Sequence, residues 1–111
     1  MTDCLFCKII KGEIPTNFVY QDEKFVAFKD IKPSAPVHIL VIPKKHIEKL
    51  QDINDNEVEL LGQLILTAKK IAVQEKIDRG FKVIVNCGRE GGQKIFHLHV
   101  HLLGGWEGGV D

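Results

Sequence analysis

The spacing of apolar positions predicts two helices, one short and one long. Asp3 is a plausible N-cap for a short helix that continues through Lys11 and ends at Gly12. The long helix has the stronger pattern, since Asn54 and Glu57 have the spacing of a capping box. Its apolar residues repeat at three- and four-residue steps, as an amphipathic helix requires, and it should end near Glu75 or Ile77. This predicted apolar stripe consists of Val58, Leu61, Ile65, Ala68 and Ala72.

Short runs of β-branched and aromatic residues between turn signals predict about five strands. The loops between them carry proline, serine or glycine, notably over residues 31–36 and 88–93. One long helix beside this many strands favours an α+β fold with a mainly antiparallel sheet. The predicted strands cover Phe18–Tyr20, Phe25–Phe28, Val37–Ile42, Phe81–Cys87 and Ile95–Leu103.

Composition excludes several classes of protein. The 111 residues fit a single domain, 1–111, and contain 15 basic and 15 acidic side chains, so the formal net charge is zero. That balance argues against nucleic-acid or membrane-surface binding, which usually needs a basic patch. The sequence has no membrane span and no signal-peptide pattern, so a cytoplasmic protein is expected.

The last predicted strand carries three histidines. Alternation along a strand puts His97, His99 and His101 on one face, while the other face is apolar: Phe96, Leu98, Val100 and Leu102. Three imidazoles in a row could share a metal, could provide a nucleophile with two helpers, or could be ordinary hydrogen-bonded residues. The preceding glycine-rich loop, 88–93, can turn backbone N–H groups toward an anion, and Asn86 could add a side-chain donor.

The cysteines allow two interpretations. Cys4-x-x-Cys7 has the spacing of two thiolates in a tetrahedral zinc site, and it equally fits two buried free thiols. Cys87 is expected in the core. Trp106, in the glycine-rich tail 104–111, could pack against a neighbouring surface, including a second subunit.

The run His97-Leu98-His99-Val100-His101-Leu102-Leu103 resembles the signature of the histidine triad (HIT) family. Further similar blocks are Asp30–Pro33, His38–His46, Gly91–Gln93 and Gly104-Gly105, so the resemblance extends from about Cys4 to Gly105. It implies a HIT-like fold and is closest to the small nucleotide-binding members that hydrolyse purine nucleoside phosphoramidates. Homodimerisation is a further implication of this resemblance.

The resemblance also implies a role for each site residue. His99 matches the nucleophile that becomes nucleotidylated, His101 matches a phosphate ligand that also helps to protonate the leaving group, and His38 matches a residue that supports His99. Nucleotide-binding roles fall on Asp30 (ribose), Ile31 (base), and Asn86, Gly92 and Gln93 (phosphate). Lys94 departs from the family, which often has Ser or Thr there. Its backbone N–H can still serve the phosphate, and its ammonium could attract an acidic leaving group.

A structural zinc site is implied as well, with Cys4, Cys7, His46 and His97 as its four ligands and with no catalytic metal required. In that case His97 has a different role from His99 and His101. Three alternatives stay open: a dinucleoside polyphosphate hydrolase, a nucleotide-binding module with weak catalysis, and a metalloenzyme that holds one zinc with all three triad histidines.

Overall fold

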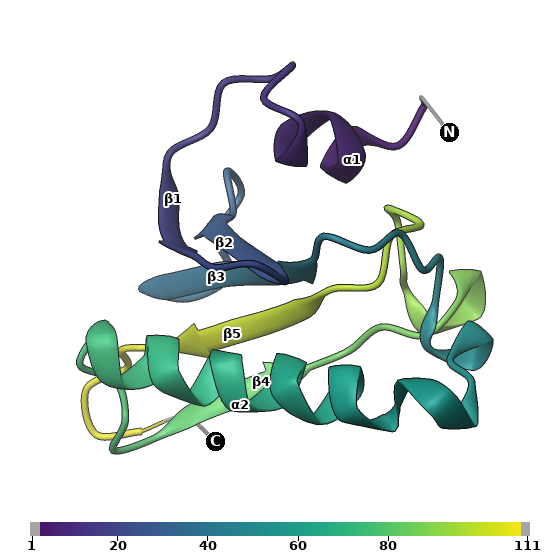
Figure 1. Cartoon of the computed structure of the whole chain (residues 1–111). Coiled ribbons are helices and arrows are strands. Elements are labelled where there is room, and N and C mark those ends of the chain that lie inside the picture. The colour runs from purple at the N-terminus through teal and green to yellow at the C-terminus, as the bar shows by residue number, and fades with distance from the viewer. Residues whose placement is uncertain (1–2, 110–111) are drawn as a thin grey trace.

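The computed structural model describes residues 3–109 and consists of one antiparallel sheet with a helix against each face (Figure 1). The strand order is β1-β2-β3-β5-β4. The expected α+β class is therefore confirmed, with one short and one long helix. The elements are α1 (Leu5–Ile10), β1 (Phe18–Gln21), β2 (Phe25–Lys29), β3 (Val37–Pro43), α2 (Val58–Gln74), β4 (Phe81–Ile84) and β5 (Val100–Gly104).

The two faces of the sheet bury separate apolar clusters because side chains alternate along each strand. On β3, Ile39 and Val41 face α2, whereas Leu40 and Ile42 face α1. The α2 side forms the larger core and includes Leu98, Val100 and Leu102, as predicted for the apolar face of the last strand. Phe96, predicted with them, is instead 39% exposed. The α1 side forms a smaller core around Phe6, Ile9 and Phe28.

The start of α2 follows the predicted capping box. The backbone N–H of Asn54 donates to Glu57 Oε1 at 2.9 Å, and a short 3₁₀ turn leads into the helix. The predicted apolar stripe was partly wrong, since Val58 is 66% and Ile65 is 42% exposed. The buried face lies further round the helix and consists of Leu64, Thr67, Ala68, Ile71 and Ala72.

Two predicted strands are shorter in the structure. The last strand begins at Val100 rather than Ile95, because the N–H of Leu98 donates to the carbonyl of Ile47 in the loop after β3 and makes no ladder bond. β4 then ends at Ile84, which pairs with His101, because β5 begins only one residue earlier, at Val100, and has no further residues for β4 to pair with. Cys87 therefore lies outside the strand and is half-buried, not in the core as expected.

Two smaller expectations concern the ends of the chain. Cys4, not Asp3, caps α1, and its Sγ accepts from the N–H of Cys7 at 3.4 Å. Trp106 lies beneath the ammonium group of Lys82, which is 5.3 Å from the ring centroid. The last two residues of the predicted tail, like residues 1 and 2, lie outside the described residues. No helix within residues 3–109 is long and apolar enough to span a membrane.

Candidate active site and candidate metal centre

The three triad histidines lie on the α1 side of the sheet but have different surroundings. Only His101 is part of β5, while His97 and His99 belong to the irregular segment that precedes it. Both of these rings lie in a T-shaped arrangement with the ring of Phe6 from α1, with ring centroids 5.9 Å and 5.2 Å away. The ring centroids of His99 and His101 are 5.0 Å apart. The predicted common side is therefore correct, although the predicted regular strand is not.

The tautomer of His99 follows from the one hydrogen bond that its ring makes within residues 3–109. Its Nδ1 lies 2.7 Å from the backbone carbonyl of His97, and a carbonyl only accepts, so Nδ1 carries the proton. The lone pair is consequently on Nε2. Burial lowers the pKa of His99 below its ordinary value, while the hydrogen bond to His97 and the charge of Asp30 act in the opposite direction. The ring is therefore neutral at pH 7 and has one nitrogen available as a nucleophile.

His38 fixes the tautomer of His101 through a short relay. The backbone N–H of Ser34 donates to His38 Nδ1 at 3.0 Å, so the proton of His38 is on Nε2. This Nε2–H donates to His101 Nδ1 at 2.9 Å, which leaves His101 with its proton on Nε2. Burial, followed by neighbouring His99 and His38, lowers the pKa of His101 to about 4. His101 therefore presents a neutral N–H donor beside His99.

Asp30, the residue directly after β2, lies beside His38 and His101. Its Oδ2 is 3.5 Å from His38 Nε2, and its Oδ1 accepts from the N–H of Lys32 at 2.8 Å. Asp30, His38 and His101 are close enough to hold an ion, but the proton on His38 Nε2 occupies the position that a ligand lone pair would need. The neighbouring Ile31 is 92% exposed, so its side chain is free to cover a ligand.

The glycine-rich loop is largely self-contained. The N–H groups of Gly91, Gly92 and Gln93 all donate to carbonyls within the loop, and Asn86 Nδ2 donates to the carbonyl of Gly91 at 2.9 Å. Gly92 has a left-handed backbone with φ of 90°, which favours glycine. Among residues 3–109, the N–H of Lys94 makes no hydrogen bond and so stays available to an anion.

The side chain of Gln93, predicted as a phosphate ligand, bonds to backbone groups in this structure. Its side chain is 4% exposed, and Oε1 accepts from the N–H of Gly88 at 2.9 Å. Its Nε2 donates to the carbonyls of Glu48 (2.7 Å) and Ile95 (3.0 Å). Both N–H groups of the amide and its oxygen are thus bonded to backbone groups. Through these bonds Gln93 ties the loop to the neighbouring segments.

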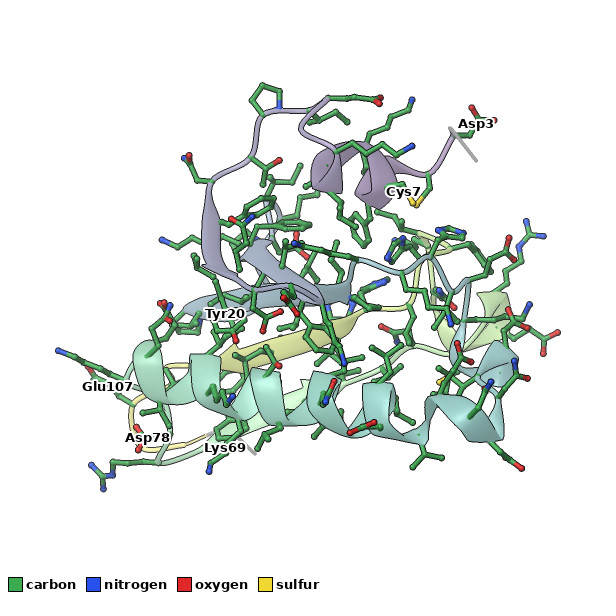
Figure 2. The ribbon with its side chains drawn as sticks, viewed as in Figure 1. Asp3, Cys7, Tyr20, Lys69, Asp78 and Glu107 are labelled. Carbon is green, nitrogen blue, oxygen red and sulfur yellow. The ribbon has the colours of Figure 1, made fainter. Side chains whose placement is uncertain are left out.

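A second group of side chains gathers where α1 meets the loops. Cys4, Cys7, His46 and His97 each place one ligand atom within 4.8 Å of the others. His97 Nδ1 lies 3.4 Å from Cys4 Sγ, 3.6 Å from Cys7 Sγ and 3.1 Å from His46 Nδ1. Figure 2 shows Cys7 at one end of α1, and its sulfur faces His46.

The geometry of this Cys/His group suits a tetrahedral ion. Zinc bonds of about 2.0 Å to nitrogen and about 2.3 Å to sulfur require ligand atoms roughly 3.3–3.8 Å apart. The Nε2 of His97 lies 2.7 Å from the carbonyl of Pro43 and must carry the proton, which leaves Nδ1 as the ligand atom. Because His97 belongs to this group and His101 to the Asp30 group, the geometry does not support one metal shared by the triad.

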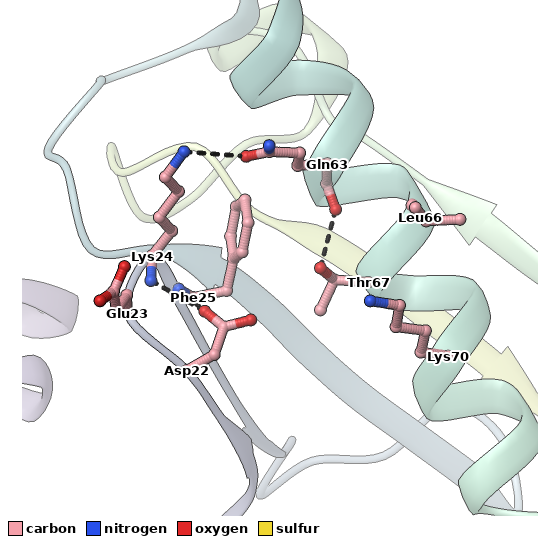
Figure 3. Close-up of a pocket in the computed structure, with 8 residues that line it drawn as sticks. All are labelled: Asp22, Glu23, Lys24, Phe25, Gln63, Leu66, Thr67 and Lys70. Carbon is pink, nitrogen blue, oxygen red and sulfur yellow. Dashed lines mark hydrogen bonds between the residues drawn. The ribbon is translucent and has the colours of Figure 1, made fainter.

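A depression of about 420 Å³ lies elsewhere, between the β1–β2 turn and α2 (Figure 3). Its polar atoms are mostly paired. Asp22 Oδ1 accepts from the N–H groups of Lys24 and Phe25, Lys24 Nζ donates to Gln63 Oε1 at 3.2 Å, and Thr67 donates to the carbonyl of Gln63 at 2.7 Å. Of these bonds, the one between Lys24 and Gln63 joins the turn to the helix.

Three contacts at the two sites were not foreseen from the sequence: Phe6 on His99, the N–H of Ser34 on His38, and the carbonyl of Pro43 on His97. Two of them are backbone groups, which no residue pattern reveals. Phe6 gave one usable signal, because it lies between the two cysteines of Cys4-x-x-Cys7 and so had to share their surroundings.

Comparison with known proteins agrees with this architecture. Residues 3–107 match the family model described as "Scavenger mRNA decapping enzyme C-term binding". The chain is 47% identical over 105 residues to the "14 kDa zinc-binding protein" of Brassica juncea, with 93% of each chain covered. Among solved structures, it is similar to a HIT family hydrolase from Clostridium thermocellum (TM-score 0.93, 46% identity, 100% and 97% covered). It is also similar to a histidine triad nucleotide-binding protein from Candida albicans (TM-score 0.81, 36% identity, 98% and 86% covered).

The fold and the histidine-lined site are those of a histidine triad protein. The chain belongs to the HIT family, as the resemblance of its motifs predicted.

Proposed function

We propose that this protein is a hydrolase of purine nucleoside phosphoramidates and that His99 is its nucleophile. One observation carries the proposal: the carbonyl of His97 holds the proton of His99 on Nδ1, so the lone pair of Nε2 is free beside the N–H of His101. The relatives named as HIT family hydrolases and as a histidine triad nucleotide-binding protein support the class of reaction.

In the proposed reaction, His99 Nε2 attacks the α-phosphorus while the P–N bond to the leaving amine breaks. The amine takes a proton from His101 Nε2–H or from water, and a nucleotidyl-histidine remains. Water then attacks the same phosphorus and the P–Nε2 bond breaks, which releases the nucleoside monophosphate and returns the electron pair to His99. The proton that this water loses replaces the one given to the amine. The N–H groups of His101 and Lys94 would stabilise the negative charge on the phosphoryl oxygens.

Binding of the nucleotide would use the groups around these two histidines. Asp30 Oδ2 accepts from the ribose hydroxyls, and the exposed Ile31 packs on the base. Asn86 and Gly92 shape the phosphate side of the loop, and His38 keeps His101 in its donor form. In this proposal Gln93 supports the loop and does not touch phosphate.

A direct test is to supply wild-type protein with an adenosine phosphoramidate, stop the reaction rapidly and measure the intact mass. Turnover together with a protein adduct of one nucleoside monophosphate would support the proposal. Nucleotide binding without turnover or adduct would contradict it and would favour the binding-module alternative.

A dinucleoside polyphosphate is the second candidate substrate, because the cations Arg89 and Lys94 line one open depression with Gly92 and Phe96. Neither cation forms an ion pair within the part of the chain that the structure describes. A phosphate leaving group would suit such a surface better than a neutral amine. The ratio of kcat/KM for the two substrates, measured in the same assay, decides between them.

We further propose that the Cys/His group binds one structural zinc ion. The ligand-atom distances fit the ion, and the Brassica juncea relative is named a zinc-binding protein. We expect about one equivalent of zinc per chain in purified wild-type protein, measured by elemental analysis. Cys7→Ser should lose most of it, whereas Cys87→Ser, outside the group, should keep it. Equal zinc content in both variants would contradict the ligand assignment.

A homodimer is proposed from an exposed apolar surface at one edge of the sheet. β4 is the end strand, and its Val83 and Ile84 are 37% and 39% exposed. Val58 and Ile65 lie on the flank of α2 opposite to Gln63 and Lys70, which face the β1–β2 turn. A symmetric pair of subunits would bury both sets of apolar residues.

Light scattering at micromolar concentration should therefore give twice the mass of one chain. Ile65→Glu should shift the protein to the monomer, because it places a charge in the proposed interface. Leu66→Glu is the matched control, since Leu66 is similarly exposed but lies on the other flank of α2. A monomeric wild-type protein, or a dimer that survives Ile65→Glu, would contradict the proposed surface.

A further inference from the structure

His97 takes part in both sites at once. Its ring faces Cys4, Cys7 and His46 through Nδ1, while its backbone carbonyl accepts the Nδ1 proton of His99. The ring is completely buried and is held from the other side by the Pro43 carbonyl. A displacement of this ring that side-chain rotation does not absorb moves the peptide of the same residue, and that peptide provides the only hydrogen bond described for His99 within residues 3–109.

A second connection between the two sites runs through α1. Within residues 3–109, every hydrogen bond from residues 3–13 to the rest of the chain involves Cys4 or Cys7. A helix of six residues is not stable by itself, so these contacts and the apolar packing of Phe6 and Ile9 keep α1 in place. Phe6 lies between the cysteines and meets His99 edge-on, with the ring planes at 87°.

We propose that the Cys/His group acts as a positioning device for His99 and that its ligand occupancy controls the rate of nucleotidyl transfer. With the ligand atoms held together, the carbonyl of His97 and the ring of Phe6 fix the direction of His99 Nε2. Without that restraint, α1 and the segment before β5 loosen, and the lone pair points at phosphorus for a smaller fraction of the time. His97 is thus a positioning residue in this inference, which rests on the proposed function of His99 and on the proposed zinc site.

Loss of the ion should affect the chemical step and leave nucleotide binding unchanged. The groups assigned to the nucleotide include Asp30, Ile31, Asn86 and Lys94, and none of their described hydrogen bonds involves the Cys/His group. Nucleotide affinity should therefore survive loss of the ion, while the rate of adduct formation falls by roughly 10- to 100-fold, as is usual when a supporting shell or an attack geometry is disturbed.

The experiment compares zinc-loaded wild type, wild type stripped with a chelator, and the variants His46→Asn and Cys87→Ser. His46 contacts Cys7 and His97 but has no described contact with His99, so its replacement reaches the nucleophile only through the group. Cys87→Ser is the matched control outside the group. Three quantities are measured on each sample: the single-turnover rate of adduct formation, the Kd for adenosine monophosphate, and the proton NMR signal of the His99 Nδ1–H.

The inference requires a slower rate, an unchanged Kd and a weakened or lost Nδ1–H signal in both the stripped protein and His46→Asn, with Cys87→Ser like wild type. An unchanged rate in protein shown to be free of metal would overturn it. Joint loss of the rate and of nucleotide binding would overturn it too, since the group would then only maintain the fold. If zinc-loaded wild type forms no adduct, the proposed function fails, and the Nδ1–H signal still decides whether the group positions His99.

Discussion

Replacing His99 with alanine should lower turnover of an adenosine phosphoramidate by about 10⁴-fold or more, the usual result of removing a covalent nucleophile. The variant should also form no mass adduct in a quenched reaction. The physical reason is that the neighbouring imidazoles cannot take over. His97 uses Nε2 on the Pro43 carbonyl, and His101 carries its proton on Nε2 because His38 donates to its Nδ1. Only His99 combines a neutral ring with a free lone pair at this position.

Binding of adenosine monophosphate provides the control for this variant. Asp30 and the loop of Asn86 make their contacts without His99, so the Kd should change much less than the rate. Residual turnover within about 10-fold of wild type would show that water is activated directly, without a covalent step. An adduct that persists in His99→Ala would identify a different nucleophile.

Leu64→Ala should lower the free energy of unfolding by about 3–4 kcal/mol, the usual cost of deleting a leucine side chain from a close-packed core. Leu64 is 1% exposed and belongs to the α2 side of the core, where it packs with Val41, Leu98 and Leu102 among others. Ile71 and Ala68 of the same helix belong to this core too, and a close-packed interior relaxes only partly around a new cavity. Urea unfolding followed by circular dichroism measures the difference.

Leu66→Ala is the matched control, because it removes the same side chain from the same helix two residues away. Leu66 is 49% exposed, so its replacement should change the free energy of unfolding by only about 0.5 kcal/mol. Similar losses in the two variants would mean that the helix is rotated from the position described, with Leu66 buried.

Much of the fold could be predicted because its patterns are local. The capping box of Asn54 and Glu57 and the runs of β3 and β2 depend on neighbouring residues, and the structure confirms them. Which face of α2 is buried was harder to predict, because Val58 and Ile65 continue the helical repeat of apolar residues on a flank of the helix that the core does not reach. Hydrophobicity gives the period of a helix but does not say how wide its buried face is.

The site shows the same limit in its polar contacts. The Cys4-x-x-Cys7 spacing and the resemblance to the family together named the two cysteines and two histidines that lie side by side in the structure, and HIT family membership followed from the ordered blocks. The partners of those side chains are mostly backbone groups from distant loops. Gln93 illustrates this best: its motif position suggested a phosphate ligand, yet Glu48 and Gly88 use its amide. Hydrogen-bond partners depend on tertiary placement, which no local pattern encodes.

The central strand pair has a consequence for how this chain reaches its active form. β3 pairs with β5 through Leu40 and His101, and the whole of α2 and β4 lies between them in the sequence. Bringing such distant segments together requires closing a long loop, which slows folding and favours local structure first. His38 and His101 meet only when this pairing closes. A nascent or partly refolded chain therefore lacks the relay entirely, and enzymatic activity would report completion of the sheet more faithfully than helix content does.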